Sequence, residues 1–149
     1  MRLFFVFLLT LSISSLYAQE IKEDGYYYLD GNLFSGTLTE KYDDGEIKTR
    51  MVILNGKPHG ESEHYYENGN VKEIRSFRDG QKHGKWIQYN ENNVMISMAH
   101  YRRDDKHGEW RIWDDNGNLR YILHYEDGEK AGTWEMFDED GKLIESKTY

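Results

Sequence analysis

The chain has no cysteine and only one proline among its 149 residues. Without cysteine there is no disulfide framework, no thiolate metal site and no cysteine for a lipid anchor, so stability must come from packing. Basic residues are also in the minority, because 19 Lys and Arg stand against 27 Asp and Glu and give a formal net charge of −8. A nucleic-acid-binding protein needs a basic field that replaces counterions, so the charge argues against nucleic acid as the partner.

Long apolar stretches are confined to the first residues of the chain. Arg2 precedes an apolar run from Leu3 to Leu11, and a small polar stretch then leads to Ala18. This is the layout of a secretory signal peptide, and the run is too short to span a bilayer. We therefore predict a signal peptide over residues 1–18 and an extracytoplasmic location, in the periplasm, at the cell surface or secreted. A buried N-terminal strand or helix is the alternative interpretation.

Aromatic residues are abundant, at 15% of the chain, and they follow a 24-residue period. A glycine marks the same phase of every unit: Gly36, Gly60, Gly84, Gly108 and Gly132. Two residues after this glycine stand Leu38, Ser62, Trp86, Trp110 and Trp134, and five after it stand Lys41, Tyr65, Tyr89, Trp113 and Phe137. Periods of about 20 to 50 residues indicate a repeat architecture, so we predict about five units.

Each unit contains two turn signals separated by short stretches rich in Tyr, Trp, Ile and Val. One is an Asp-Gly or Asn-Gly pair, as in DDGE at 43–46 and DNGN at 115–118. Such pairs favour two-residue hairpin turns, because those turns need positive φ. The second signal comes about ten residues later, in segments such as NGKPHG and DGQKHG. The predicted fold is therefore all-β: a repeat protein built as a single-layer antiparallel β-meander of stacked hairpins with a 24-residue period.

The chain divides into three parts in this interpretation. Residues 1–18 form the signal peptide, residues 19–35 an N-terminal linker and capping half-repeat, and residues 36–149 the repeat array, with units starting at 36, 60, 84, 108 and 132. One hairpin alone is marginal in water, so the rings of neighbouring units must stabilise each other. Positions two and five after the repeat glycine would point to opposite faces of a flat strand, so we expect a β-bulge or strong twist near them.

Histidines recur beside the repeat glycine, and acidic residues recur in the turns. Equivalent residues of successive units lie two strands apart, roughly 9.5 Å at about 4.8 Å per strand, which is too far to share one zinc ion. Carboxylates at regularly spaced turns do not converge as calcium requires. We therefore expect no metal and no cofactor, and a structural role for these histidines.

The chain carries no Gly-x-Ser-x-Gly motif, no His-Glu-x-x-His motif and no phosphate-cradling loop. These motifs place a nucleophile, a metal ion or a phosphate, so their absence argues against the common hydrolases. We expect no enzyme activity and no catalytic residue. A carboxylate pair at the spacing of a glycosidase stays open as an alternative.

The segment NGKPHGESEHYYENGNVKEIRSFRDGQKHGKWIQY resembles the MORN-repeat variant family, whose members repeat a phrase close to Gly-Lys-x-His-Gly-x-Trp-x-x-Tyr-x-x-x-Gly-x-Leu. The resemblance covers residues 26–149 and extends to toxin–antitoxin system YwqK-family antitoxins, so the chain looks like an exported bacterial member. It implies an open sheet of stacked hairpins, a role as an interaction module, and a link to membranes and anionic lipids. The chain departs from the phrase at Ser62, Asn93, Asp104 and Ala131.

We expect the protein to be an exported, non-enzymatic module for protein–protein interaction, with another protein as its partner. Exposed aromatic stripes are typical binding surfaces. The candidate partner-binding residues are Trp86, Tyr89, Trp110, Trp113, Trp134 and Phe137. The alternative for each ring is a role in the core.

Two other functions stay open. An anionic lipid or the cell-envelope surface would bind an edge that collects basic side chains. This edge is formed by Lys57, His59, Lys82, His83, Lys106, His107 and Lys130. An antitoxin or immunity role differs from the leading hypothesis only in its partner, which would be a toxin. The oligomeric state is left open, although exposed sheet edges allow self-association.

Overall fold

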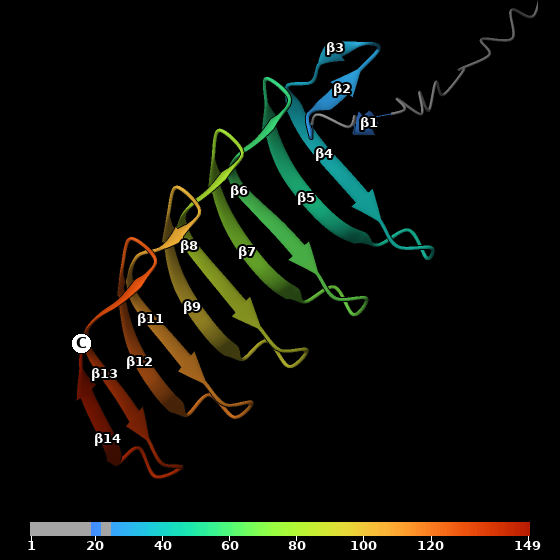
Figure 1. The fold of residues 1–149 in the computed structure, drawn as a ribbon. Coiled ribbons are helices and arrows are strands. Elements are labelled where there is room, and N and C mark those ends of the chain that lie inside the picture. Colours follow the sequence, from blue (N-terminus) through green and yellow to red (C-terminus); the bar gives the residue numbers. More distant parts are fainter. Residues whose placement is uncertain (1–18, 22–24) are drawn as a thin grey trace, which may run out of the picture.

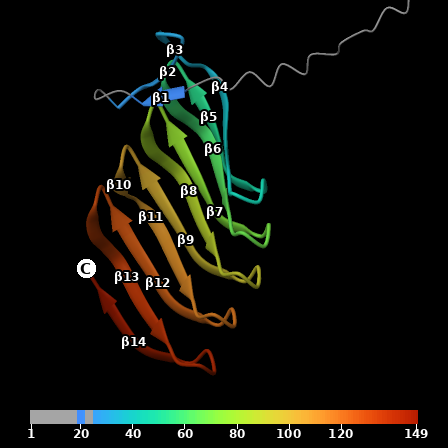
Figure 2. The same cartoon turned by 90° about the vertical axis from the view of Figure 1, so that its right-hand side faces the viewer.

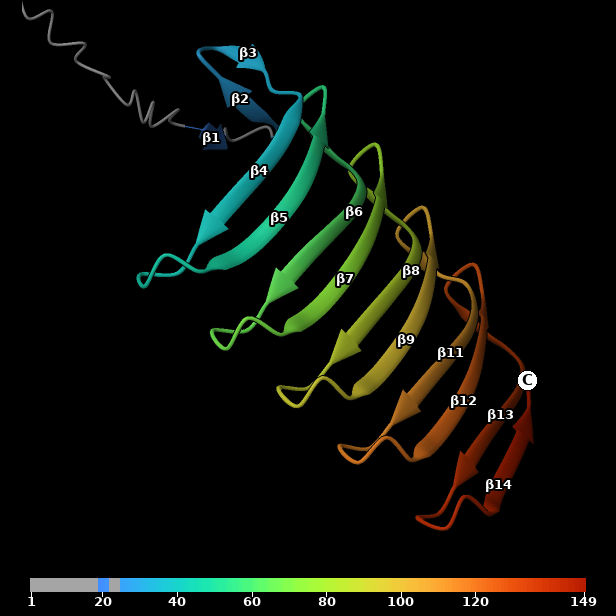
Figure 3. The same ribbon diagram turned by 180° about the vertical axis from the view of Figure 1, so that it is seen from behind.

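The computed structural model describes residues 19–21 and 25–149. The signal peptide that we predict over residues 1–18 lies outside the described residues. The described part is all-β and contains no helix, which confirms the predicted fold class. Figure 1 shows hairpins that follow one another in an open, curved sheet, and Figure 3 shows the same sheet from behind.

Most strands belong to one 11-stranded antiparallel sheet, in the order β14-β13-β12-β11-β9-β8-β7-β6-β5-β4 with β10 (Asp105–Lys106) paired to β9. The first strands of the units are β4 (Gly36–Lys41), β6 (Lys57–Tyr65), β8 (Gln81–Tyr89), β11 (Gly108–Trp113) and β13 (Glu129–Phe137). The second strands are β5 (Ile47–Leu54), β7 (Val71–Arg78), β9 (Met95–Arg102), β12 (Leu119–Glu126) and β14 (Leu143–Thr148). Strands that follow each other in the chain are neighbours in the sheet, as in a meander.

A smaller three-stranded sheet precedes the array. Its strands are β1 (Gln19–Ile21), β2 (Tyr27–Leu29) and β3 (Asn32–Leu33), in the order β1-β2-β3. The Tyr27 N–H donates to the Gly56 carbonyl, and the Gly56 N–H donates to the Phe34 carbonyl. These bonds tie the small sheet to the first turn of the array, and Figure 2 shows it at the β4 end.

The turn that joins one unit to the next is a two-residue connection. Asn55 and Gly56 both have positive φ, at 49° and 75°, and the pairs at 79–80 and 127–128 do the same. Two positive φ values in succession match the twist of a hairpin. Arg103 and Asp104 adopt this conformation without glycine, and the Asp104 carboxylate accepts a hydrogen bond from the Lys82 N–H at 2.8 Å.

The acidic turn inside each unit is longer than expected. The Gly45 N–H donates to the Tyr42 carbonyl, the Tyr42 N–H donates to the Glu46 carbonyl, and only Gly45 of the loop 43–45 has positive φ. This is a three-residue loop, in which a type I turn is followed by one left-handed residue. The predicted two-residue turn is therefore wrong at this place, because a single left-handed glycine already closes the hairpin.

A register shift interrupts the pairing between positions four and five of every unit. In β8 it lies between Gln88 and Tyr89, and in β11 between Ile112 and Trp113. The shift confirms the expected irregularity near the two aromatic columns. Because a β-bulge increases local twist and bends a strand, it also agrees with the curvature of the sheet in Figure 2.

The repeat glycine allows a close approach between neighbouring strands. Gly84 has a φ of 95°, and a Cβ atom at this residue would lie 3.2 Å from the Cβ atom of Ser76. A Cβ atom at Gly132 would likewise lie 3.4 Å from the Cβ atom of His124. A side chain at either position would strain the backbone and also crowd the adjacent strand.

We expect Gly84→Ala to lower the free energy of unfolding more than Gly141→Ala does. Both glycines have positive φ, which costs an L-residue about 1–2 kcal/mol. Only at Gly84 would the new Cβ atom meet a neighbouring strand, since nothing lies within 4 Å of a Cβ atom at Gly141. Urea denaturation followed by tryptophan fluorescence measures both changes. Equal losses in the two variants would show that the contact with Ser76 is unimportant.

Candidate functional site

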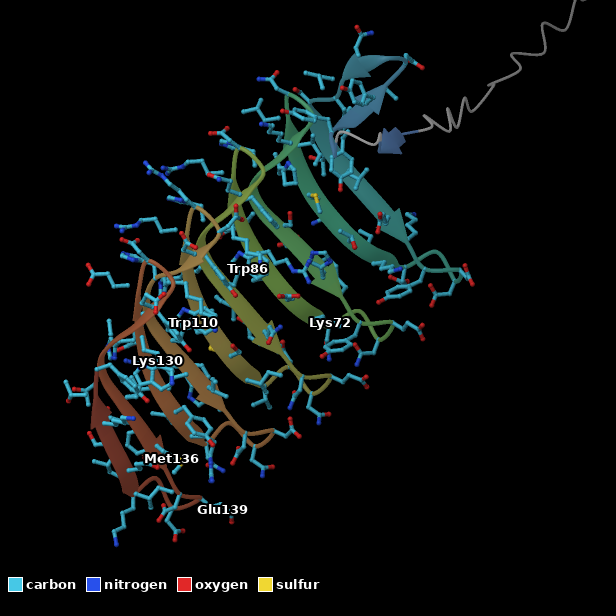
Figure 4. The ribbon with its side chains drawn as sticks, viewed as in Figure 1. Lys72, Trp86, Trp110, Lys130, Met136 and Glu139 are labelled. Carbon is cyan, nitrogen blue, oxygen red and sulfur yellow. The ribbon has the colours of Figure 1, made fainter. Side chains whose placement is uncertain are left out.

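A continuous row of aromatic rings crosses the array on one face of the sheet. We name it the ring ladder, and it consists of Phe77, Trp86, Tyr101, Trp110, Tyr125, Trp134 and Tyr149. Successive centroids are 5.0 to 5.6 Å apart, and successive planes are inclined by 55° to 60°. Tilted and edge-to-face contacts of this kind are favoured for aromatic pairs. Figure 4 labels Trp86 and Trp110, which lie in successive units along the row.

The ladder follows from the period of the sequence. Pairing of β8 with β9 places Trp86 opposite Ala99, two residues before Tyr101. Because residues two apart on a strand share a face, Tyr101 becomes the diagonal neighbour of Trp86. Trp110 stands 24 residues after Trp86 and contacts Tyr101 from the next unit, at 5.2 Å between centroids. Repetition of this step extends the row.

Hydrogen bonds hold each indole ring in place. The indole N–H donates to a carbonyl of the preceding strand: Trp86 to Ser76 at 3.0 Å, Trp110 to His100 at 3.0 Å and Trp134 to His124 at 2.9 Å. A tryptophan that is partly buried needs such a partner for its single donor. The same bond therefore recurs in each unit and fixes the orientation of the ring.

Lysine side chains lie over the ladder, one for each of the last three unit junctions. The distances from Nζ to the two nearest ring centroids are 4.8 and 5.0 Å for Lys82, 4.8 and 4.7 Å for Lys106, and 4.4 and 4.8 Å for Lys130. At an exposed site each cation–π contact stabilises by about 0.5–1 kcal/mol. The aliphatic stem of a lysine can cover apolar surface while its ammonium group stays in water, so the ladder also carries a row of positive charge.

The ladder is partly exposed along its whole length. Its rings are half-buried from Phe77 to Trp134, and Tyr149 is 44% exposed. In the described part of the chain only Leu38, Ile53 and Ala99 are buried apolar residues. The ladder therefore serves as core and as surface at once.

The second aromatic column lies apart from the ladder. Tyr89, Trp113 and Phe137 follow the register shift, close to the acidic turns, and none of the ring contacts in residues 25–149 includes them. Of the candidate rings, the structure brings together only Trp86, Trp110 and Trp134. It joins to them four rings that sequence analysis did not assign to a site: Phe77, Tyr101, Tyr125 and Tyr149. Their constant place, 17 residues after the repeat glycine, is the signal that identifies them.

The candidate basic edge separates into lysines and histidines. The lysines turn to the rings, whereas His59 Nδ1 lies 3.4 Å from the Asp79 carboxylate and His107 Nδ1 lies 3.7 Å from the Asp127 carboxylate. His83 is half-buried and has no such aspartate, because Arg103 stands at the position equivalent to Asp79 and Asp127. The histidines thus belong to the turns, and aspartates share their edge.

Lys57 differs from the other lysines because it is one residue out of phase. Pro58 occupies the column of Lys82, and Lys57 Nζ lies 4.8 Å from the centroid of the Tyr26 ring. A hydrogen bond with Tyr26 is the largest cause that raises the pKa of Lys57. The structure therefore places Lys57 with the N-terminal segment and not with the ladder.

A polar cluster adjoins the N-terminal end of the ladder, where Ser62 stands in place of tryptophan. Ser62 is 1% exposed, and the guanidinium of Arg75 lies 5.3 Å from the centroid of the Trp86 ring. Arg75 also pairs with the buried Glu73 carboxylate at 2.6 Å, and Gln88 donates to the same carboxylate. Sequence analysis missed this cluster, and the serine in the tryptophan column is the signal that points to it.

His64 lies in the same region, between Thr49 on β5 and Glu73 on β7. Partial burial is the largest cause that lowers the pKa of His64, followed by the positive charge of Arg75. Thr49 Oγ1 is 3.3 Å from His64 Nδ1, so the row has the residue types of a catalytic triad. However, the Glu73 carboxylate accepts from Arg75 and Gln88, and Thr49 is only 4% exposed. The row is therefore better described as a structural network.

Two kinds of feature are absent from the described ranges. No group of three or more His, Asp or Glu side chains there is arranged to hold a metal ion. The acidic turns bind their own backbone instead, as in Asp114, whose pKa is lowered chiefly by the hydrogen bond from the Asn118 N–H. Residues 19–21 and 25–149 also contain no helix that is long and apolar enough to cross a bilayer.

The fold and the ladder define an open β-repeat protein, in which each unit is completed by the next. The MORN repeat variant matches four segments of the chain, residues 58–79, 82–103, 106–127 and 130–149. These segments cover more than half of the chain and share the 24-residue spacing of the ladder. The chain belongs to the MORN repeat variant family. A search of curated proteins gave no match.

Trp110→Ala is expected to lower the free energy of unfolding by about 2–4 kcal/mol, because two ring contacts and the indole hydrogen bond are lost. Trp113→Ala removes the same kind of side chain outside the ladder, so it is expected to lower the free energy of unfolding by less. Chemical denaturation followed by far-UV circular dichroism compares the two variants. A larger loss at Trp113 would mean that the ladder is not the main source of stability between units.

Acidification is expected to destabilise the protein in part through His64. Its pKa in the folded chain lies below the value of about 6.5 in the unfolded chain, so the unfolded chain binds the proton more readily. The stability is fully present above about pH 7 and is lost as the pH falls through about 6.5 toward the folded pKa.

The free energy of unfolding at about pH 7.5 and about pH 5 measures this effect. His64→Gln should reduce the difference between the two pH values, whereas His83→Gln, a matched change outside the polar cluster, should reduce it less. If wild type and His64→Gln lose the same stability on acidification, His64 is not responsible.

Proposed function

We propose that this protein is an exported, non-enzymatic module for protein–protein interaction, and that its partner binds the ring ladder together with the lysines above it. MORN repeats are typically modules for interaction with proteins or membranes. One observation carries the proposal: the ladder exposes part of each ring and adds one ammonium group per unit from Lys82, Lys106 and Lys130.

The chemistry of the ladder suits a protein segment that is both apolar and acidic. Aromatic side chains at the centre of an interface supply much of the binding energy, and charged groups around them fix orientation. Equivalent rings recur at every second strand, roughly 9.5 Å apart. A partner segment that lies across the strands would therefore meet a ring and an ammonium group at regular intervals.

The compartment and the kind of protein partner are proposed from the sequence. The first 18 residues have the layout of a signal peptide, so we place the module outside the cytoplasm. An antitoxin or immunity role is the same proposal with a toxin as the partner. A toxin encoded beside this chain would support that version.

Affinity capture after mild cross-linking tests the protein-binding proposal, with the tagged full-length chain as bait. The ladder variant carries Lys82→Gln, Lys106→Gln and Lys130→Gln, which remove charge and keep every ring. The matched control carries Lys48→Gln, Lys72→Gln and Lys142→Gln, which remove the same charge beside the acidic turns; Figure 4 shows Lys72 on that side of the sheet. We expect the wild-type bait and the control bait to recover one and the same protein, and the ladder variant to recover much less of it. Equal recovery with all three baits would contradict the proposal.

A second candidate, binding to an anionic membrane surface, is favoured by the same row of lysines. Each basic residue near an anionic surface contributes about 1 kcal/mol. The aspartates beside His59 and His107, and the formal net charge of −8, oppose it. Co-sedimentation with phosphatidylglycerol vesicles separates this function from the first. Salt-sensitive binding that the ladder variant loses would support it, and no binding at low salt would reject it.

A further inference from the structure

The strand β14 lies at an open edge of the long sheet. Among the described strands it pairs only with β13, and all six of its residues, Leu143–Thr148, are exposed. Leu143 is 45% exposed and Ile144 is 54% exposed. An exposed edge strand that carries apolar residues is a template for pairing with another strand.

The backbone groups that face outward on β14 can be identified from its pairing with β13. The Tyr149 N–H donates to the Gly132 carbonyl. Because successive residues of an antiparallel strand direct their N–H and C=O groups to opposite sides, those of Lys147 and Glu145 also face β13. Ser146 and Thr148 therefore direct theirs outward. The register shift opposite Phe137 lies at the Leu143 end, so the regular part of the strand runs from Glu145 onward.

The sequence of β14 is complementary to itself in one register. A two-fold axis through Ser146 places Glu145 opposite Lys147 of a second copy, twice over by symmetry. It also pairs Ser146 with Ser146 of the second copy through their outward-facing backbone N–H and C=O groups. Ile144 of each copy then lies near Thr148 of the other. An axis through Glu145 or through Lys147 would place like charges opposite each other, which is unfavourable. Charge and hydrogen bonding thus select the same register.

The same register covers the open end of the ring ladder. Tyr125 lies between two tryptophans, at 5.2 Å from Trp110 and 5.3 Å from Trp134. Tyr149 has a single ring neighbour, Trp134, and is 44% exposed; the ammonium groups of Lys130 and Lys147 lie 4.8 and 4.7 Å from its centroid. Pairing through Ser146 places Tyr149 beside the Leu143 end of β14 of the second copy, where contact between the two copies would replace water.

The other open edge of the sheet, β4, is a poorer partner for β14. If β14 met β4 of a second copy in the register of β5 and β6, where Thr49 lies opposite His64, then Glu145 would lie opposite Glu40. Such head-to-tail contacts also produce open chains unless the rotation between copies happens to close a ring. A two-fold contact closes after two copies.

We infer that this protein forms a two-fold dimer through antiparallel pairing of β14 with β14 of a second copy, centred on Ser146. The sheet continues through both copies, and because the axis is perpendicular to the sheet, both ring ladders lie on the same face. A partner with two binding segments would then engage both ladders at once. The dimer itself does not depend on the proposed function.

Sedimentation-velocity centrifugation of the full-length chain over a concentration series tests the dimer. Wild type should show a monomer–dimer equilibrium. Glu145→Lys and Lys147→Glu each place like charges opposite each other in both halves of the contact, so each should raise the dissociation constant about tenfold or more. An equimolar mixture of the two variants restores both ion pairs and should dimerise again, as should the double variant.

Charge changes at the opposite edge provide the controls. Glu40→Lys and Lys41→Glu on β4 alter the charge by the same amounts and should leave the dimer intact. Circular dichroism and thermal melting establish that each variant is folded. Monomers at every concentration of wild type would overturn the proposal. So would a mixture of Glu145→Lys and Lys147→Glu that stays monomeric, or dissociation by Glu40→Lys, which would indicate head-to-tail pairing instead.

Discussion

A single layer of strands has no second layer against which to bury its apolar face, and this constraint governs the structure. The rings of the ladder pack on each other across the strands instead, with centroids 5.0 to 5.6 Å apart. Each tyrosine in the middle of the row is enclosed by one tryptophan of its own unit and one of the next. Removal of one unit would therefore expose the ring of its neighbour, so stability resides mainly at the interfaces between units.

Much of the fold follows from the phase of the sequence. The spacing from Gly36 to Gly132 predicts stacked hairpins, because every unit returns to the same two turns. The residues two and five after the repeat glycine would point to opposite faces of a flat strand. This predicts the irregularity that the structure has at Gln88 and Tyr89. The geometry of the acidic turn is not predictable in the same way. An Asp-Gly pair fits a two-residue turn or a type I turn closed by one left-handed glycine, and strand register decides between them.

The candidate site is less predictable, because its parts come from different strands. Trp86 is visible in the sequence, but its partner Tyr101 is 15 residues away and becomes a neighbour only through strand pairing. Residue type can also mislead: Lys57 resembles the other lysines of the turns, yet Pro58 holds the place in phase with Lys82. The cluster around Ser62 depends on which side chains fill the space of a missing tryptophan, and a column of residue types does not contain that information.

The lysines over the ladder connect its stability with binding. Their stems limit the contact of the rings with water, which keeps a row of half-exposed aromatics soluble. A cation–π contact at an exposed site is worth about 0.5–1 kcal/mol, similar to an exposed ion pair. An approaching carboxylate can therefore draw an ammonium group from its rings at little net cost and without a change in the sheet. For this reason neutralised lysines distinguish binding from folding, whereas a lost tryptophan disturbs both.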